Sequence, residues 1–178
     1  MSRIAIPATE SATGPTAELY AQIKQAAGKV PNTFAVIGAL GPAALEGILQ
    51  ADDVLARSSL SKQDQETIKL LVSELSGCDY CAAAHTQLAK TTGISPAIVR
   101  QIRAGQPTGD AKRDALVHLV GELVKTSGTI SDQDFSAIKA AGYTAQHLVD
   151  ISLAIAVITF TNVFNRMNNT ELDYSAVA

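Results

Sequence analysis

Helix start and stop signals recur at short intervals along the whole chain, and they constrain the fold more than any other feature. Between them, apolar residues fall at helical spacing, as in Ile68, Leu71, Val72 and Leu75. No run of alternating β-branched residues stands out, and aromatic residues make up only 4% of the chain. The pattern therefore predicts an all-α fold, a single-domain helical bundle.

The breaks also predict where each helix begins and ends. Ser61 and Ser131 are N-cap candidates, and each is followed three residues later by an aspartate, a weak form of the capping box. Gly77 ends the helix that Ser61 starts. The expected helices cover residues 16–27, 32–39, 42–55, 61–76, 78–92, 95–104, 110–127, 131–141 and 144–167.

A length of 178 residues suits one domain. Within it, residues 1–30 are expected to form an N-terminal arm and first helix that pack on a neighbouring subunit. Residues 31–178 are expected to form the main helical domain. Segments 61–93 and 131–167 share their capping pattern, which would fit an internal two-fold repeat.

Charge and hydropathy argue against nucleic acid and membranes as binding partners. The net charge is −3 and the basic residues are scattered, so we expect no nucleic-acid partner. The first residues contain no long apolar run, so we expect no signal peptide and a cytoplasmic location. Residues 148–164 are apolar but interrupted by polar side chains, and they fall short of the roughly 20 residues of a spanning helix, so no membrane partner is expected.

The apolar segment 148–164 is better explained as a helix buried on nearly all sides, in the core or at a subunit interface. Charged residues make up 17% of the chain, below the usual share of about 25%. Such a shortage of charge indicates that apolar surface is covered by another subunit. We therefore expect a homo-oligomer.

The two cysteines of the chain, Cys78 and Cys81, have Cys-x-x-Cys spacing, and His85 follows the second by four residues. Residues three and four apart share one face of a helix. A helix starting at Cys78 would place its positive N-terminal end beside the pair, and with the imidazole this favours thiolate over thiol. In a reducing cytosol such a pair is more often catalytic or metal-binding than structural.

Glu66 is the residue expected to complete this site. It lies eleven residues before Gly77, and His85 lies eight after it. If the two helices pack as an antiparallel pair, the offset of three residues is roughly 4.5 Å along the axis. Glu66 could then reach His85 directly or through one water, giving a proton path from carboxylate to imidazole to the Cys81 thiol.

This arrangement predicts thiol redox chemistry. Attack of the Cys81 thiolate on a peroxide oxygen would yield a sulfenic acid. Cys78, one helical turn away, would condense with it and release water. An external dithiol or thiol protein would then reduce the disulfide by exchange.

Other interpretations of these residues stay open. The cysteines with His85 could be three ligands of a zinc site, but zinc prefers four, and His118 and His147 fall on other helices. The cysteines could also be inert core residues, and Glu66 a solvated surface residue. Glu74 is an alternative base that we place on a solvated face, and Asp79 complements the helix dipole. No cofactor and no metal are expected.

The motif of Glu66, Cys78-x-x-Cys81 and His85 resembles the alkylhydroperoxidase-D-like branch of the carboxymuconolactone decarboxylase family. Residues 160–165 and 169–173 are similar to its peroxidase-related subgroup, and the resemblance covers about residues 20 to 175. It implies an all-helical fold and homo-oligomers, commonly trimers or hexamers. It also implies that Cys81 attacks the peroxide, Cys78 resolves the intermediate, and His85 with Glu66 relays protons.

The resemblance has one departure. The best-known members carry a histidine between the cysteines, where this chain has Tyr80, so one proton donor is lost. The decarboxylase members lack the cysteine pair, and lactone decarboxylation is therefore not expected. Two function classes remain: a thiol-dependent peroxidase or disulfide oxidoreductase, and a non-catalytic helical oligomer that senses oxidants or binds other proteins. Glu66 and His85 favour the first class, because a passive sensor has less need of a proton relay.

Overall fold

The computed structural model describes residues 1–174, in which helices are the main elements and no strand is present, so the all-α prediction is confirmed for this part of the chain. Each observed bound lies within about two residues of the expected one, as capping signals rarely fix a terminus more closely. The elements are η1 (Thr9–Ser11), α1 (Gly14–Ala27), α2 (Asn32–Leu40), α3 (Pro42–Ala56), α4 (Lys62–Leu75), α5 (Asp79–Thr91), α6 (Pro96–Arg103), α7 (Ala111–Lys125), α8 (Asp132–Ala140) and α9 (Ala145–Asn168).

Both serine caps are present. The Ser61 hydroxyl accepts a hydrogen bond from the Asp64 backbone N–H at 3.0 Å, and Ser131 forms a complete capping box with Asp134. The helices that follow differ: α4 and α5 have 14 and 13 residues, whereas α8 and α9 have 9 and 24. The similarity of the two segments is thus seen at the caps, and an internal repeat stays a prediction.

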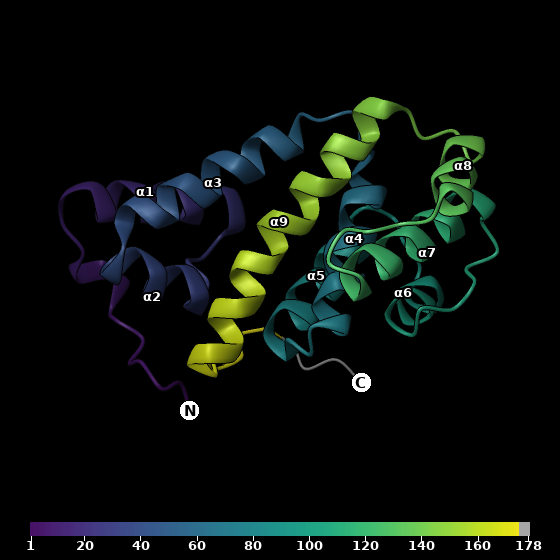
Figure 1. Cartoon of the computed structure of the whole chain (residues 1–178). Helices are drawn as coiled ribbons and strands as arrows, with labels where there is room; N and C mark the ends of the chain where they lie inside the picture. The colour runs from purple at the N-terminus through teal and green to yellow at the C-terminus, as the bar shows by residue number, and fades with distance from the viewer. Residues whose placement is uncertain (175–178) are drawn as a thin grey trace.

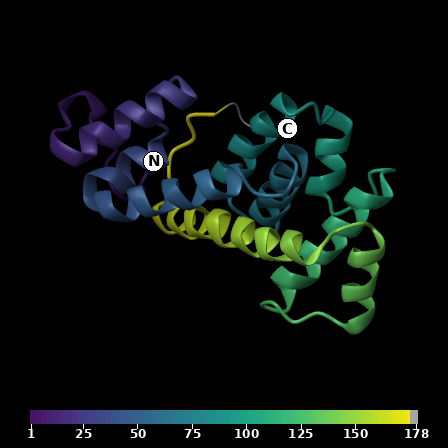
Figure 2. The same ribbon diagram turned by 90° about the horizontal axis from the view of Figure 1, so that it is seen from above.

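Helix α9 runs between two groups of helices (Figure 1). The helices α1 to α3 lie on one side of it and α4 to α8 on the other, an arrangement that is also visible from above (Figure 2). Helix α4 has its main contacts with α5, α7 and α9. The residues that α4 carries are therefore fixed from several directions.

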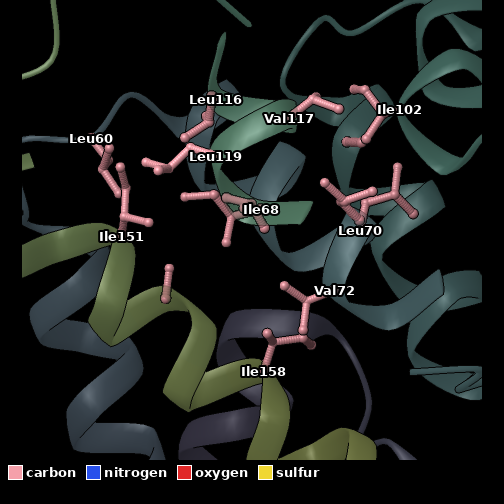
Figure 3. Close-up of a cluster of buried hydrophobic side chains, with 14 of the residues drawn as sticks. Leu60, Ile68, Leu70, Val72, Ile102, Leu116, Val117, Leu119, Ile151 and Ile158 are labelled. Atoms are coloured by element: carbon pink, nitrogen blue, oxygen red, sulfur yellow. The ribbon is translucent and has the colours of Figure 1, made fainter. Parts of the chain in front are cut away.

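Two clusters of buried apolar side chains correspond to these groups. The larger is built by α4 to α9 and includes Ile68, Leu119 and Ile158 (Figure 3). The smaller joins α1, α2 and α3 around Tyr20 and Leu45. Helix α1 therefore packs on α2 and α3 of its own chain, and the division of the chain at residue 31 stays a prediction.

Helix α9 is only partly covered by its own chain. It is long and apolar enough to cross a membrane, a property that core helices of soluble proteins share. Its buried face carries polar residues that face protein, among them Asp150 and Asn162, while Val149, Val163 and Met167 are 63%, 59% and 59% exposed. Burial on nearly all sides is thus wrong within one chain. Coverage of the exposed face by another subunit stays a prediction.

The α4 helix offers a matched test of the core. Leu71 is 2% exposed, whereas Leu75, one turn later in the same apolar pattern and the last residue of α4, is 51% exposed. Leu71→Ala should lower the free energy of unfolding by roughly 2–5 kcal/mol, since it removes buried methyl groups and leaves a cavity. Leu75→Ala should change it by less than about 1 kcal/mol. Urea unfolding measures both, and equal losses would contradict the core assigned to α4.

Candidate active site

The turn between α4 and α5 positions both cysteines. Gly77 has a φ of 67°, in the left-handed region that favours glycine, and this lets the chain reverse. The Cys78 backbone N–H returns to the Ser73 carbonyl at 2.9 Å, closing the end of α4. As a result α5 begins at Asp79, and Cys78 is its N-cap residue rather than its first helical residue.

Glu66 and His85 face each other across the two antiparallel helices. The His85 Nδ1 atom lies 2.8 Å from the Glu66 Oε2 atom, and the two side chains are 14% and 12% exposed. The direct contact expected from their spacing is therefore present. A carboxylate bonded to one ring nitrogen fixes the orientation of the imidazole and leaves its other nitrogen free to handle a proton.

The two cysteines are free, and both are buried. A hydrogen bond from the Cys81 thiol lowers the pKa of Cys78, and the Cys81 backbone N–H, 3.4 Å from the Cys78 Sγ atom, lowers it further against the effect of burial. The same thiol hydrogen bond raises the pKa of Cys81, and burial adds to this. The expectation that the helix start favours the thiolate form of both cysteines is thus corrected. Cys78 caps the helix, and of the two cysteines it is the one whose pKa is lowered.

Helix α9 supplies two polar groups to Cys81 that sequence reasoning missed. The Asn165 Nδ2 atom donates to the Cys81 Sγ atom at 3.2 Å, and the Thr161 hydroxyl lies 3.9 Å from the same sulfur. Both contacts act to lower the pKa of Cys81. They join residues 80 and 84 positions apart, and the one available signal was that residues 160–165 resemble the peroxidase-related subgroup.

Two cavities adjoin the cysteine pair. Cys81 lines one of about 350 Å³ together with Glu66 and His85. Much of its wall is apolar, formed by Phe34, Ile48, Leu49, Leu88 and Val157. Cys78 lines the second, of about 370 Å³, whose wall is more polar and includes Arg166. The Glu66–His85 pair therefore shares a cavity with Cys81 and not with Cys78.

Tyr80, between the cysteines, contacts the C-terminal segment, residues 170–174. Its hydroxyl donates to the Asp173 Oδ1 atom at 2.6 Å and accepts from the Thr33 backbone N–H at 3.3 Å. Its ring meets Tyr174 edge-to-face with centroids 5.5 Å apart, and Lys29 pairs with Asp173 at 2.8 Å. Burial and the Asp173 carboxylate raise the pKa of Tyr80. Tyr80 therefore anchors the C-terminal segment, and its proton is already committed to Asp173.

Tyr80→Phe should free that segment, because it removes the hydroxyl that Asp173 accepts from. We expect a loss of roughly 1–3 kcal/mol in the free energy of unfolding, the usual cost of leaving a partly buried polar group unpaired. Hydrogen exchange should show faster exchange in residues 170–174. Tyr143→Phe is a matched control, since the Tyr143 hydroxyl donates to Asp64 at 2.9 Å away from this segment. Unchanged exchange in Tyr80→Phe would contradict the anchoring role.

The remaining sequence candidates lie apart from the cavity or have structural partners. Glu74 forms a half-buried ion pair with Arg103, so its placement on a solvated face is corrected. Asp79 is exposed in the first turn of α5. His118 pairs with Asp134 at 2.8 Å, and His147 caps α9 with Thr144. Within residues 1–174 no cluster of three or more acidic, histidine or cysteine side chains is arranged to hold a metal ion.

Comparison with known proteins bears on both fold and family. Residues 42–119, which contain Glu66, both cysteines and His85, match the carboxymuconolactone decarboxylase family. A sequence comparison with curated proteins finds no match.

Among solved structures, the chain is similar to an uncharacterised peroxidase-related protein from Ralstonia eutropha described as an alkylhydroperoxidase AhpD core. The TM-score is 0.84 at 21% identity, covering 97% of this chain and 92% of that one. An uncharacterised peroxidase-related protein from Silicibacter sp. gives a TM-score of 0.82 at 19% identity, covering 96% and 91%. The debrominase Bmp8 gives 0.78 at 14% identity, covering 97% and 91%.

These matches cover the part of the chain that carries the candidate site. The family match spans the α4–α5 hairpin that carries the four predicted residues, and the structural matches extend the likeness over nearly the whole chain. Residues 42–119 thus match the carboxymuconolactone decarboxylase family, and the chain has the all-α fold of AhpD-like, peroxidase-related proteins.

Proposed function

We propose that this protein is a thiol-dependent peroxidase, a disulfide oxidoreductase that reduces hydroperoxides through Cys81 and Cys78. The observation that carries the proposal is the shared cavity, in which the hydrogen-bonded Glu66–His85 pair and Cys81 lie together. A nucleophilic thiol needs a nearby base, and that base needs a group to orient it. The peroxidase-related proteins of the same fold support this class of reaction.

The proposed cycle has three steps. The proton of the Cys81 thiol passes to the Glu66–His85 pair, and the Cys81 thiolate attacks the outer oxygen of the hydroperoxide. The O–O bond breaks, the sulfur becomes a sulfenic acid, and the leaving alkoxide takes a proton to become an alcohol. The Cys78 thiolate then displaces hydroxide from this sulfur, which leaves as water once protonated, and a disulfide forms. An external dithiol or thiol protein reduces the disulfide by exchange and leaves oxidised.

The apolar wall of the cavity supports an organic hydroperoxide as the substrate. Phe34, Leu49 and Val157 offer surface to a hydrocarbon body, and hydrogen peroxide would leave that surface unused. The same fold also occurs in a debrominase, so the fold alone does not identify the reaction, and the main support for the proposal is the site.

The test is peroxide consumption by the purified protein with dithiothreitol as the donor. We expect multiple turnovers with cumene hydroperoxide, and a lower kcat/KM for hydrogen peroxide. Consumption no faster than with donor alone would contradict the peroxidase and favour the alternative, a non-catalytic helical oligomer that senses oxidants or binds other proteins. In that case the cysteines would still oxidise, but without turnover.

We further propose that the protein is a homo-oligomer, a trimer or hexamer. The support is the exposed apolar face of α9, where Val149, Val163 and Met167 lie open within one chain. Light scattering should give a multiple of the 18.6 kDa chain mass at micromolar concentration. Val163→Glu should shift the assembly toward smaller species, because a charge would be buried in the interface. A clean monomer mass for the unaltered protein would contradict the proposal.

A further inference from the structure

Two polar side chains of α9 contact the Cys81 sulfur, and Asn165 makes the shorter of the two contacts. Its residue is 3% exposed, and its Nδ2 atom lies 3.2 Å from the Cys81 Sγ atom. Its Oδ1 atom is fully buried and has no hydrogen-bond partner within residues 1–174. The side chain thus makes one polar contact, and that contact is with a reactive atom.

This half-satisfied arrangement is not explained by stability. Leaving a buried amide oxygen without a partner costs roughly 1–3 kcal/mol, which a leucine of similar size would avoid. A hydrogen bond from an amide N–H is stronger when the acceptor is charged, so the contact favours the Cys81 thiolate over the thiol. The amide is therefore placed to stabilise the form of Cys81 that reacts.

We infer that Asn165 is a further catalytic residue, whose amide N–H holds the Cys81 sulfur and stabilises its negative charge. The inference deepens the proposed peroxidase and rests on it for the reaction. The same hydrogen bond acts in the first and the last step of the cycle. In the first step it stabilises the Cys81 thiolate that attacks the peroxide. In the last step an external thiolate attacks Cys78, the S–S bond breaks and Cys81 leaves with the electron pair, which is faster when the Cys81 thiolate is stabilised.

Other charged or titratable groups lie in or beside the two cavities next to the cysteine pair and have to be kept constant in any test. They are Cys78 and His85 beside and on α5, Lys62, Glu66 and Lys69 on α4, Asp52 on α3, Arg166 on α9, and Tyr174 with its neighbour Asp173. None of these is altered by a substitution at position 165.

The test measures the thiolate of Cys81 directly, by its rate of alkylation with iodoacetamide across pH in a Cys78→Ser background. Adding Asn165→Leu should move the midpoint of the alkylation profile up by about one pH unit, and slow alkylation at pH 7 roughly tenfold, the size expected for one hydrogen bond to a charged group. Asn165→Asp has the same shape but places a carboxylate beside the sulfur, and should move the midpoint at least as far.

Asn162→Leu is the matched control. Asn162 lies one turn earlier on α9, is 1% exposed, and also has one amide atom without a partner, but its described bond is with Ser73 and not with a cysteine. We expect it to leave the alkylation midpoint unchanged. Thermal unfolding of both leucine variants shows whether they fold. If Asn165→Leu does not fold, the alkylation midpoint of Asn165→Asp decides the test.

An unchanged midpoint in folded Asn165→Leu or Asn165→Asp would overturn the inference, and so would an equal shift in Asn162→Leu. Because alkylation uses no peroxide, this result is separate from the fate of the proposed function. If the protein does not consume peroxide but the midpoint shifts, Asn165 still stabilises the Cys81 thiolate, and only the proposed peroxidase activity is contradicted.

Discussion

Cys81→Ser is expected to reduce peroxide consumption to the rate of donor alone, because it removes the atom that attacks the O–O bond. Stopped-flow mixing with cumene hydroperoxide and a dithiol should show neither a burst nor turnover. The loss should be complete rather than partial, since a serine hydroxyl in the same cavity is a far weaker nucleophile than a thiolate.

Cys78→Ser distinguishes the role of the attacking cysteine from that of the resolving cysteine. It should still react once with peroxide and stop at a sulfenic acid on Cys81, which a sulfenic-acid trap such as dimedone would label. The opposite pattern, a label on Cys78 in the Cys81→Ser variant, would contradict the assignment. Labelling of Cys78 would have a physical reason, because the pKa of Cys78 is lowered in the structure and a thiolate is the reactive form. The assignment to Cys81 rests on its cavity, which contains Glu66 and His85.

Glu66→Gln and His85→Gln should each slow the peroxide reaction at pH 7 by about 10²- to 10⁴-fold, the usual contribution of a positioned acid–base group. The raised pKa of Cys81 makes its proton hard to remove, so without the pair the rate should climb with pH as hydroxide takes over. The steady-state pH–rate profile measures this, and KM for the peroxide should change little.

The double variant tests whether Glu66 and His85 act as a unit. Groups that act together lose activity non-additively, so the double variant should be hardly slower than the slower single variant. Glu74→Gln is a control on the same helix, since Glu74 pairs with Arg103 and does not line the cavity. Fully multiplicative losses would mean that the two residues work independently and that the relay is wrong.

The fold and the centre of the site could be predicted from the sequence because local signals determine them. Ser61 and Ser131 cap helices through neighbours three residues away, and such contacts are written in the chain order. The Glu66–His85 contact followed from one assumption, that α4 and α5 pack antiparallel around Gly77. Helical rise then places the two residues within roughly 4.5 Å of each other along the axis, which their side chains can span.

Contacts between distant segments could not be predicted in this way. Nothing near Cys81 in the chain indicates that Asn165 and Thr161 reach its sulfur, because the crossing of α9 over α5 depends on packing of the whole molecule. The same holds for Tyr80 and Asp173, which join the cysteine motif to the C-terminal segment. The opposite pKa directions of the cysteines come first from the hydrogen bond between their thiols and then from burial, and the packed structure decides both.

The proposed function depends above all on a redox pair of Cys78 and Cys81, which intact-mass spectrometry after stoichiometric peroxide can detect. We expect a loss of about two mass units, located by digestion to the peptide with both cysteines and restored by dithiothreitol. Unoxidised cysteines that remain protected from alkylation, or a stable sulfinic acid on Cys81 with Cys78 unchanged, would contradict it.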